Sequence, residues 1–148
     1  MRTAPPSDPA ARKRCFAYGA NMIAADMAAR CPAAREIGTV ILPGWRFAIM
    51  GRGYATILPE AGAAVHGVLW WITPDCERIL DQFENVAGGL YHRETLTVAA
   101  APALVYLGNG PATGRPRAGY LEPIVAAAEA RGFPPAYVAE LRRWLNPA

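Results

Sequence analysis

The sequence predicts an α+β fold, a mixed α/β arrangement in which helices flank a small curved sheet or barrel. One observation is a series of apolar or alternating runs, each of strand length, separated by Gly and Pro. The other is a set of helical stretches with recognisable first and last residues. Because the 148 residues show no internal repeat and no second composition regime, one domain is the simplest organisation.

The first 14 residues differ from the rest of the chain. They hold three prolines and no apolar run, so we expect a disordered leader at 1–14 and a single domain at 15–148. The leader also carries four basic residues against one acid, which equals the net charge of +3 of the whole chain. A basic tail is usually only solvated, and no basic stripe with aromatics follows it. We therefore expect no nucleic-acid partner.

The cysteines and the lengths of the apolar runs predict a cytoplasmic location away from the membrane. Cys15, Cys31 and Cys76 make no disulfide framework in a chain of this length, so we expect free thiols and a reducing, cytoplasmic environment. No secretory signal is visible. The longest apolar stretch, 65–72, is far below the ~20 residues needed to span a bilayer, which predicts no membrane partner.

The N-terminal elements predict a site for an anion. A first strand is expected at 15–18, where an apolar run ends at Gly19. Asn21 can cap a helix at 24–30 that ends before Pro32. The loop between them joins the end of a strand to the start of a helix, where free backbone N–H groups suit carboxylates and oxyanions.

The remaining elements follow the same signals. Further strands are expected at 37–42, 45–50, 54–58, 65–72, 91–98 and 104–107, and two last helices at 121–131 and 135–145.

A helix at 74–84 carries the most informative residue. Thr73 is a suitable N-cap and Pro74 a suitable first helical residue. The apolar face is expected to consist of Cys76, Ile79, Leu80 and Phe83. Glu84 lies on the border of that face, and it is the one carboxylate of the helix placed to face the interior. Partial desolvation would raise its pKa and make it a better proton acceptor near neutrality.

The inventory of side chains excludes several kinds of catalyst. The one serine and the one lysine lie in the leader, which excludes a serine hydrolase and a Schiff-base lysine. No Cys-x-x-Cys or His-Glu-x-x-His spacing occurs, which argues against a zinc site. A cysteine nucleophile with His66 or His92 as its base stays open, although the cysteines read better as small apolar residues.

Four segments occur in the order and approximate spacing of the gamma-glutamylcyclotransferase family: 16–22, 67–70, Leu80-Asp81 with Glu84, and 89–91. The C-terminal stretch from 120 to 141 also resembles that family's closing helical region, so the resemblance covers everything after the leader. It implies the gamma-glutamylcyclotransferase-like fold and a reaction that converts a γ-glutamyl amino acid or amine to 5-oxoproline and the free amine. It also implies that no metal, nucleotide or organic cofactor is required.

The resemblance assigns roles residue by residue. Glu84 matches the catalytic acid/base, and Tyr120 matches a tyrosine that lines the pocket. The residues that match the substrate-cradling loop are Tyr18, Gly19, Ala20 and Asn21. Two positions depart from the family pattern. Ala20 stands where serine is usual, and Asn85 stands where glycine usually follows the glutamate. Asparagine tolerates left-handed backbone conformations, so the turn after Glu84 can still form.

The reaction that the resemblance implies fits the inventory, because the substrate's own α-amine is the nucleophile. The expected partner is a small γ-glutamyl compound, and a homodimer stays open. The YGxN loop favours substrates other than glutathione. One alternative is a cyclotransferase for γ-glutamylamines or related amides. Another, of a different class, is a ligand-binding or interaction protein on the same scaffold with reduced activity.

Three further residues are candidates for the pocket. Tyr91 is expected to pack near it, after Gly89. Arg93 and Arg117 could meet substrate carboxylates, but solvated side chains are the simpler expectation for both.

Overall fold

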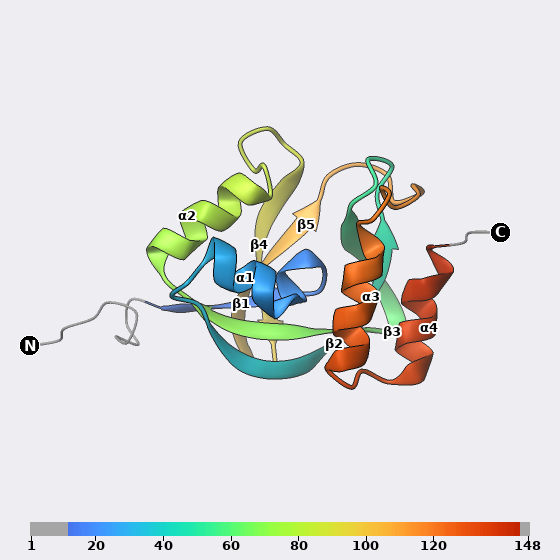
Figure 1. The fold of residues 1–148 in the computed structure, drawn as a ribbon, viewed down its shortest axis with the longest axis horizontal. Helices are drawn as coiled ribbons and strands as arrows, with labels where there is room; N and C mark the ends of the chain where they lie inside the picture. The colour runs from blue at the N-terminus through green and yellow to red at the C-terminus, as the bar shows by residue number, and fades with distance from the viewer. Residues whose placement is uncertain (1–11, 146–148) are drawn as a thin grey trace, which may run out of the picture.

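The computed structural model describes residues 12–145, which form one five-stranded sheet with helices packed on it (Figure 1). The strands are β1 (Lys13–Ala17), β2 (Arg35–Ile49), β3 (Ala55–Ile72), β4 (Tyr91–Val98) and β5 (Ala101–Gly108). The α-helices are α1 (Ala24–Arg30), α2 (Pro74–Phe83), α3 (Leu121–Ala130) and α4 (Pro135–Arg143). This arrangement confirms the predicted α+β fold.

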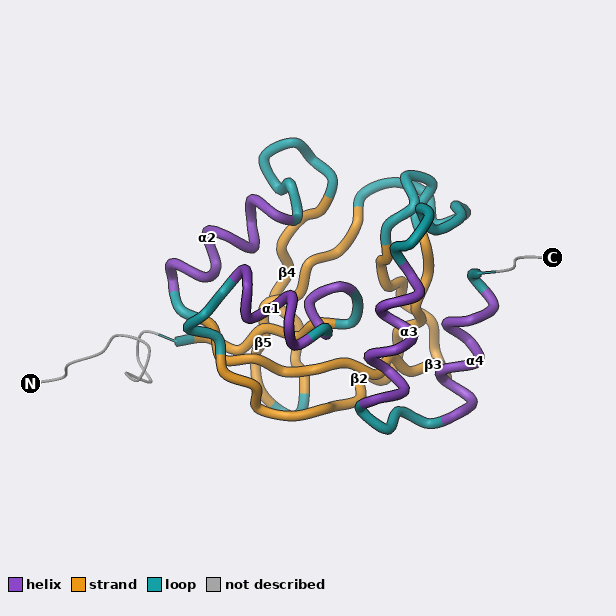
Figure 2. The backbone as a smooth tube through the Cα atoms, in the orientation of Figure 1, coloured by secondary structure: helices purple, strands orange, loops and turns teal. Residues whose placement is uncertain are grey.

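The sheet is mixed and has β1 at its centre. Its order is β2-β3-β1-β5-β4, with β1 antiparallel to β3 and parallel to β5. The outer pairs β2–β3 and β4–β5 are antiparallel hairpins. Figure 2 shows the strands bending around helices α1 and α3. The chain that leaves the end of β1 therefore emerges in the middle of the sheet, close to those helices.

The sheet has fewer and longer strands than predicted. The runs at 37–42 and 45–50 belong to one strand, β2, and those at 54–58 and 65–72 belong to β3. The register in which β2 pairs with β3 shifts between Pro43 and Trp45, while β2 itself continues. Pro and Gly here form a bulge instead of a turn, because the neighbouring strand keeps pairing on both sides of it.

The first strand begins earlier than predicted. Lys13 and Arg14 pair with Ile72 and Trp71 of β3, so the expected boundary of the leader at residue 14 is wrong for these two positions. Lys13 is also fixed by an ion pair to Glu77 at 3.0 Å. The expectation of disorder at 1–11 lies outside the described residues, as does the chain at 146–148.

Helix α2 begins as predicted but buries a narrower face. The Thr73 side chain accepts a hydrogen bond from the Cys76 N–H at 3.2 Å, which confirms the cap. Cys76 and Leu80 are buried, whereas Ile79 and Phe83 are 40% and 45% exposed, so the predicted four-residue apolar face is wrong for those two. The helix lies at the periphery of the molecule (Figure 1), where only one line of side chains meets the core.

The expectation of free thiols is wrong for two of the three cysteines. Cys31, directly after α1, forms a disulfide with Cys76 in the first turn of α2, with the Cα atoms 5.2 Å apart. Such pairing depends on how two helices pack, and 45 residues separate the partners in sequence. Cys15 is free and buried. The cysteines therefore give no argument for a reducing compartment.

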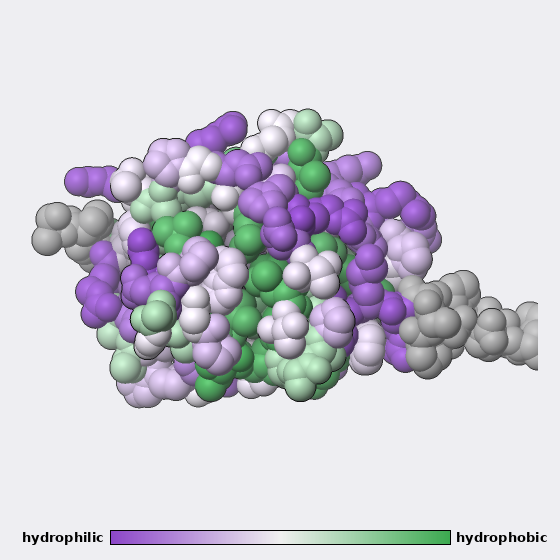
Figure 3. All heavy atoms as spheres, turned by 180° about the vertical axis from the view of Figure 1, so that it is seen from behind, coloured by the Kyte–Doolittle hydropathy of each residue, from purple (hydrophilic) through white to green (hydrophobic). Residues whose placement is uncertain are grey.

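No helix within residues 12–145 is long and apolar enough to cross a membrane. The face turned away in Figure 1 is shown in Figure 3, where apolar residues gather at the centre and hydrophilic residues lie mainly above them and at the sides. Two exposed isoleucines, Ile37 and Ile41, lie on the edge strand β2. The structure describes a single chain, so the homodimer stays a prediction.

Gly67 has a packing role at the centre of the sheet. A Cβ atom added there would meet the Ala17 carbonyl and would lie 2.6 Å from the Phe16 ring. The absence of a side chain lets the Phe16 ring lie across β3, directly before the loop that begins at Tyr18. The glycine of the 67–70 segment thus helps to position that loop.

Candidate active site

A cavity of about 350 Å³ opens where the end of β1, helix α1, the end of α2 and the start of α3 meet. Its walls include loop 18–21, Arg30 of α1, Glu84 at the end of α2 and Tyr120 at the start of α3. All six residues singled out from the sequence line this one cavity: Tyr18, Gly19, Ala20, Asn21, Glu84 and Tyr120. They come from segments up to 102 positions apart, and the central place of β1 brings them together.

Loop 18–21 runs into a short 3-10 helix, Ala20–Met22, before α1 starts. The prediction that Asn21 caps α1 is wrong, because the N-cap is Ile23 and it gives no side-chain hydrogen bond. Asn21 is buried, and its carbonyl accepts a hydrogen bond from Trp70 Nε1 at 3.1 Å. Two guanidinium N–H groups of Arg131 bond the next carbonyl, that of Met22, at 3.1 and 2.9 Å. These bonds from Trp70 and Arg131 fix the position of the loop backbone.

Two backbone donors of the loop that lines the cavity are without a partner in the part of the chain that the structure describes. The amides of Met22 and Ile23 bond the carbonyls of Gly19 and Ala20 at 2.9 and 3.1 Å. The amides of Ala20 and Asn21 have no acceptor among residues 12–145. Pre-positioned N–H groups of this kind bind anions and stabilise negative charge that develops during a reaction. The loop can therefore serve an oxyanion or a carboxylate.

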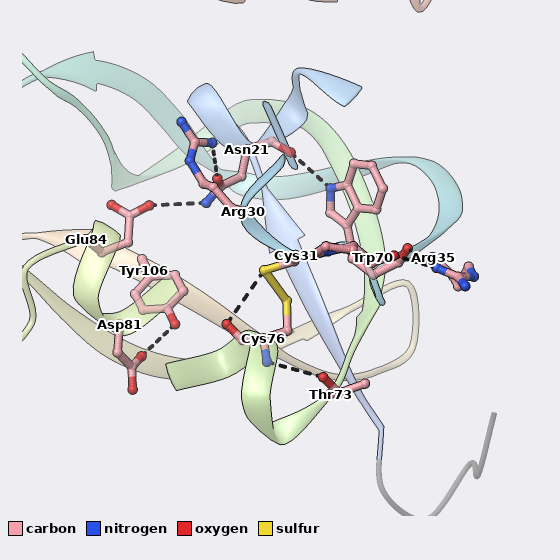
Figure 4. Close-up of a disulfide and its surroundings, with 12 residues drawn as sticks. Asn21, Arg30, Cys31, Arg35, Trp70, Thr73, Cys76, Asp81, Glu84 and Tyr106 are labelled. Carbon is pink, nitrogen blue, oxygen red and sulfur yellow. Dashed lines mark hydrogen bonds between the residues drawn. A yellow bond between two sulfur atoms is a disulfide. The ribbon is translucent and has the colours of Figure 1, made fainter. Parts of the chain in front are cut away.

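Glu84 is the C-cap of α2, and its N–H bonds the Leu80 carbonyl at 2.8 Å. Its carboxylate points toward loop 18–21 and accepts a hydrogen bond from Asn21 Nδ2 at 3.2 Å (Figure 4). Burial raises the pKa of Glu84 from 4.5 to about 7, although Arg30 and the Asn21 hydrogen bond act in the opposite direction. A carboxyl with this pKa can both accept and return a proton near neutral pH.

The turn after Glu84 has the conformation expected for Asn85. The φ angle of Asn85 is 49°, in the left-handed region that glycine and asparagine adopt most readily. Its side-chain Oδ1 accepts a hydrogen bond from the Gly88 N–H at 3.1 Å and closes the turn. The asparagine thus keeps the chain direction that a glycine would allow.

Three tyrosines stiffen the cavity wall through backbone contacts. The Tyr18 hydroxyl donates to the Tyr106 carbonyl at 2.6 Å, and burial raises the pKa of Tyr18 well above its usual value. The Ala55 N–H donates to the Tyr120 hydroxyl at 3.1 Å, while Tyr91 donates to the Ala55 carbonyl. Tyr91 is buried beside the cavity, where the sequence places it.

Asp81, the other acid of the motif, has a different position. It accepts a hydrogen bond from the Tyr106 hydroxyl at 2.6 Å (Figure 4). It also accepts one from Arg93 at 3.0 Å, and so ties α2 to strands β4 and β5. Neither Arg93 nor Arg117 lines the cavity. Arg117 packs over the Tyr54 ring and donates to the Arg52 carbonyl.

Sequence reasoning missed Arg30. This arginine ends α1, lines the cavity, and donates to Asn21 Oδ1 at 2.8 Å. Its guanidinium carbon also lies 3.6 Å from the centre of the Phe83 ring. The only signal in the sequence was a basic residue in the last turn of a predicted helix that begins at the loop, and many solvated arginines share that signal.

The alternative of a cysteine nucleophile with a histidine base finds no geometry to support it. Two of the cysteines form the disulfide, and burial raises the pKa of Cys15 to about 12. His66 packs against Phe133 and Tyr137, and neither histidine lines the cavity. Within residues 12–145, no group of three His, Cys, Asp or Glu residues could hold a metal ion.

The fold is shared with solved structures. A structure named gamma-glutamyl cyclotransferase superposes with a TM-score of 0.80 at 24% identity, over 88% of this chain and 86% of the other. YkqA from Bacillus subtilis superposes with a TM-score of 0.76 at 22% identity, over 92% and 55%. A glutathione-specific gamma-glutamyl cyclotransferase from yeast gives 0.61 at 12% identity, over 92% and 96%. At these identities the likeness shows the fold alone.

Among curated proteins, no sequence matches this chain. The family model described as gamma-glutamyl cyclotransferase, AIG2-like, matches residues 15–122, which include loop 18–21, Glu84 and Tyr120. That range also contains the whole five-stranded sheet apart from the first two residues of β1. The chain therefore belongs to the gamma-glutamyl cyclotransferase, AIG2-like family.

Proposed function

We propose that the protein is a gamma-glutamylcyclotransferase that converts a γ-glutamyl amino acid or amine to 5-oxoproline and the free amine. The observation that supports this most directly is Glu84, a carboxyl with a pKa of about 7 that faces a cavity with free backbone amides. Family membership supports the same class of reaction.

The proposed reaction is an intramolecular attack. The α-amine of the γ-glutamyl group forms a bond to its own side-chain amide carbon, which closes a five-membered ring and places a negative charge on the carbonyl oxygen. Collapse of this intermediate breaks the bond from that carbon to the amide nitrogen and releases the amine. Such attack can reach effective molarities of ~10⁵–10⁸ M, so the main task of the protein is to hold the folded-back conformer.

One glutamate can perform both proton transfers. The Glu84 carboxylate takes a proton from the attacking nitrogen and then passes it to the leaving nitrogen. In all, the α-ammonium gives up two protons to become the lactam N–H, and the amide nitrogen gains two to leave as an ammonium, so that no net proton is gained or lost. General acid–base catalysis of this kind contributes about 10²–10⁴-fold to the rate. The carbonyl oxyanion can accept hydrogen bonds from the amides of Ala20 and Asn21, where each donor is worth ~3–4 kcal/mol. Ala20 takes part only through its backbone.

The proposed substrate range follows from the reaction. Besides γ-glutamyl amino acids, γ-glutamylamines and related amides undergo the same reaction, because only the leaving nitrogen differs. A ligand-binding protein of reduced activity is the alternative of another class. Glu84 favours the enzyme, because a binding protein has no evident use for a buried carboxyl whose pKa is raised to about 7.

The test measures 5-oxoproline released from γ-glutamyl dipeptides, glutathione and γ-glutamyl-lysine. We expect release from at least one compound and a loss of about 10²–10⁴-fold in Glu84→Gln. The matched control is Asp75→Asn, which neutralises an exposed carboxylate on the same helix and should leave the rate unchanged. No release from any compound would contradict the proposed function, and an undiminished rate in Glu84→Gln would remove Glu84 from its role.

A further inference from the structure

Arg30 is the only basic side chain among the described residues that line the cavity. It shares the cavity with two acids, Asp26 and Glu84. The two arginines that the sequence offered for substrate carboxylates, Arg93 and Arg117, do not line the cavity, and the proton-transfer scheme uses no positive charge. A γ-glutamyl compound carries a carboxylate on the same carbon as its reacting amine. A cation in the cavity wall is a natural partner for that carboxylate.

We propose that Arg30 binds the α-carboxylate of the γ-glutamyl substrate and is a specificity-determining residue of this site. The inference rests on the proposed function and deepens it by assigning each polar group of the substrate to its own partner. The ammonium faces Glu84, the α-carboxylate faces Arg30, and the amides of loop 18–21 remain for the carbonyl oxyanion.

The geometry that supports this assignment is the bridge made by Asn21. Its side-chain amide donates to Glu84 at 3.2 Å and accepts from Arg30 at 2.8 Å, so one planar amide lies between the carboxylate and the guanidinium (Figure 4). The ammonium and carboxylate of an α-amino acid are separated by a similar span, because they are attached to one carbon. The zwitterionic end of the substrate can therefore lie along the Asn21 amide with each charge beside its opposite.

Arg30 is held in place before any ligand arrives. Its guanidinium stacks on the Phe83 ring and bonds Asn21, and the next residue, Cys31, is tied to α2 by the disulfide. Burial lowers the pKa of Arg30 from its usual value, whereas Asp26 and Glu84 act in the opposite direction. An arginine keeps its charge under these conditions and offers planar N–H pairs that match a carboxylate.

The experiment compares two ligands that differ only in the α-carboxylate. They are γ-glutamylalanine and 4-aminobutanoylalanine, whose cyclisation gives 2-pyrrolidinone and alanine. Alanine release gives kcat/KM for both ligands with the wild-type protein, Arg30→Met and the matched control Arg78→Met, an exposed arginine of α2. Calorimetric binding of both ligands to Glu84→Gln and to Glu84→Gln with Arg30→Met covers the case of slow turnover.

We expect kcat/KM of the wild-type protein to be about 10- to 100-fold higher for γ-glutamylalanine. A preference of this size corresponds to the usual contribution of a hydrogen bond to a charged group. In Arg30→Met this preference should fall to within a few-fold, because only the carboxylate-bearing ligand loses a partner. Arg78→Met should keep the wild-type preference. Equal losses on both ligands, or no preference in the wild-type protein, would overturn the proposal and reduce Arg30 to a structural residue.

The two proposals fail separately. Failure of every γ-glutamyl compound to give 5-oxoproline would contradict the proposed function, while Arg30-dependent binding of γ-glutamylalanine would still support a carboxylate site. Release of 5-oxoproline with an unchanged ligand preference in Arg30→Met would contradict only the assignment of Arg30.

Discussion

Asn21 donates a hydrogen bond from its side-chain amide to the Glu84 carboxylate across 3.2 Å, although 63 positions separate the two residues in sequence. This bond favours the ionised form of the carboxyl, whereas burial favours the neutral form more strongly. The pKa of Glu84 near 7 is therefore the result of opposing effects, in which burial raises it while Arg30 and the Asn21 hydrogen bond lower it. Each of them can be changed by mutation.

Removal of the Asn21 amide should move the acid limb of the pH–rate profile. In Asn21→Ala, Glu84 loses a donor to its carboxylate, so its pKa should rise above about 7 and kcat/KM should reach its plateau at higher pH. The measurement is kcat/KM for one γ-glutamyl substrate across the pH range. Asn109→Ala, which removes an exposed amide outside the cavity, is the control and should leave the limb in place. A limb that stays or moves to lower pH in Asn21→Ala would contradict this account.

Glu84 should also make the stability of the protein depend on pH. Its pKa rises from 4.5 in the unfolded chain to about 7 in the folded protein, so the folded state binds more protons between these values. The free energy of unfolding should therefore fall, through this group, as pH rises from about 4.5 to 7. The loss is on the order of 3 kcal/mol at most.

The glutamine variant provides the comparison for that loss. Glu84→Gln has no group to ionise at this position, so its stability relative to the wild-type protein should increase through the same pH window. Urea unfolding at pH 4.5 and pH 7.5 measures both proteins under matched conditions. A difference in stability that does not change with pH would show that the pKa of Glu84 is not raised.

Reduction of the Cys31–Cys76 disulfide should destabilise the fold. The bond closes a loop of 45 residues, and the chain-entropy estimate for such a loop is roughly 4 kcal/mol. Urea unfolding with and without a thiol reductant should show this loss in the wild-type protein. The double variant Cys31→Ser, Cys76→Ser should be less stable by a similar amount and should not respond to reductant. Identical midpoints for the wild-type protein in both conditions would show that the bond contributes nothing to stability.

Asn85 should be replaceable by glycine but not by alanine. Its φ of 49° costs little for glycine or asparagine, whereas alanine in this region loses about 1 kcal/mol. Both variants lose the side-chain bond to the Gly88 N–H, so the difference between them isolates the effect of the backbone conformation. Asn85→Ala should therefore be less stable than Asn85→Gly by about 1 kcal/mol. Chemical denaturation measures both variants. An alanine variant as stable as the wild-type protein would mean that the turn relaxes without cost.

Local sequence was sufficient for the fold class and for most elements. The cap at Thr73, the helix that follows it and the strand at 91–98 all depend on residues near in sequence. The number of strands was not predictable in the same way. The continuation of β2 through Pro43 and Gly44 depends on its pairing with β3, which no local pattern contains.

The residues of the candidate site also fall into two groups: those that local sequence identifies and those that it does not. Glu84 and loop 18–21 could be identified from the sequence because an end-of-helix glutamate and a strand-to-helix loop have local signatures, and the resemblance to a family joined them. Arg30 could not, because a single arginine at the end of a helix has no signature that separates it from a solvated one. Only the fold places it beside Asn21 and over Phe83.

Patterns within the sequence were thus enough to predict the kind of fold, the family resemblance and the carboxyl at the centre of the proposed chemistry. The tertiary structure alone decided the disulfide, the burial that raises the pKa of Glu84 and the positive charge across from it. The physical reason is one of range. Capping, periodicity and turn preference act over a few residues, whereas desolvation, charge pairing and disulfide geometry depend on groups that meet only when distant segments pack.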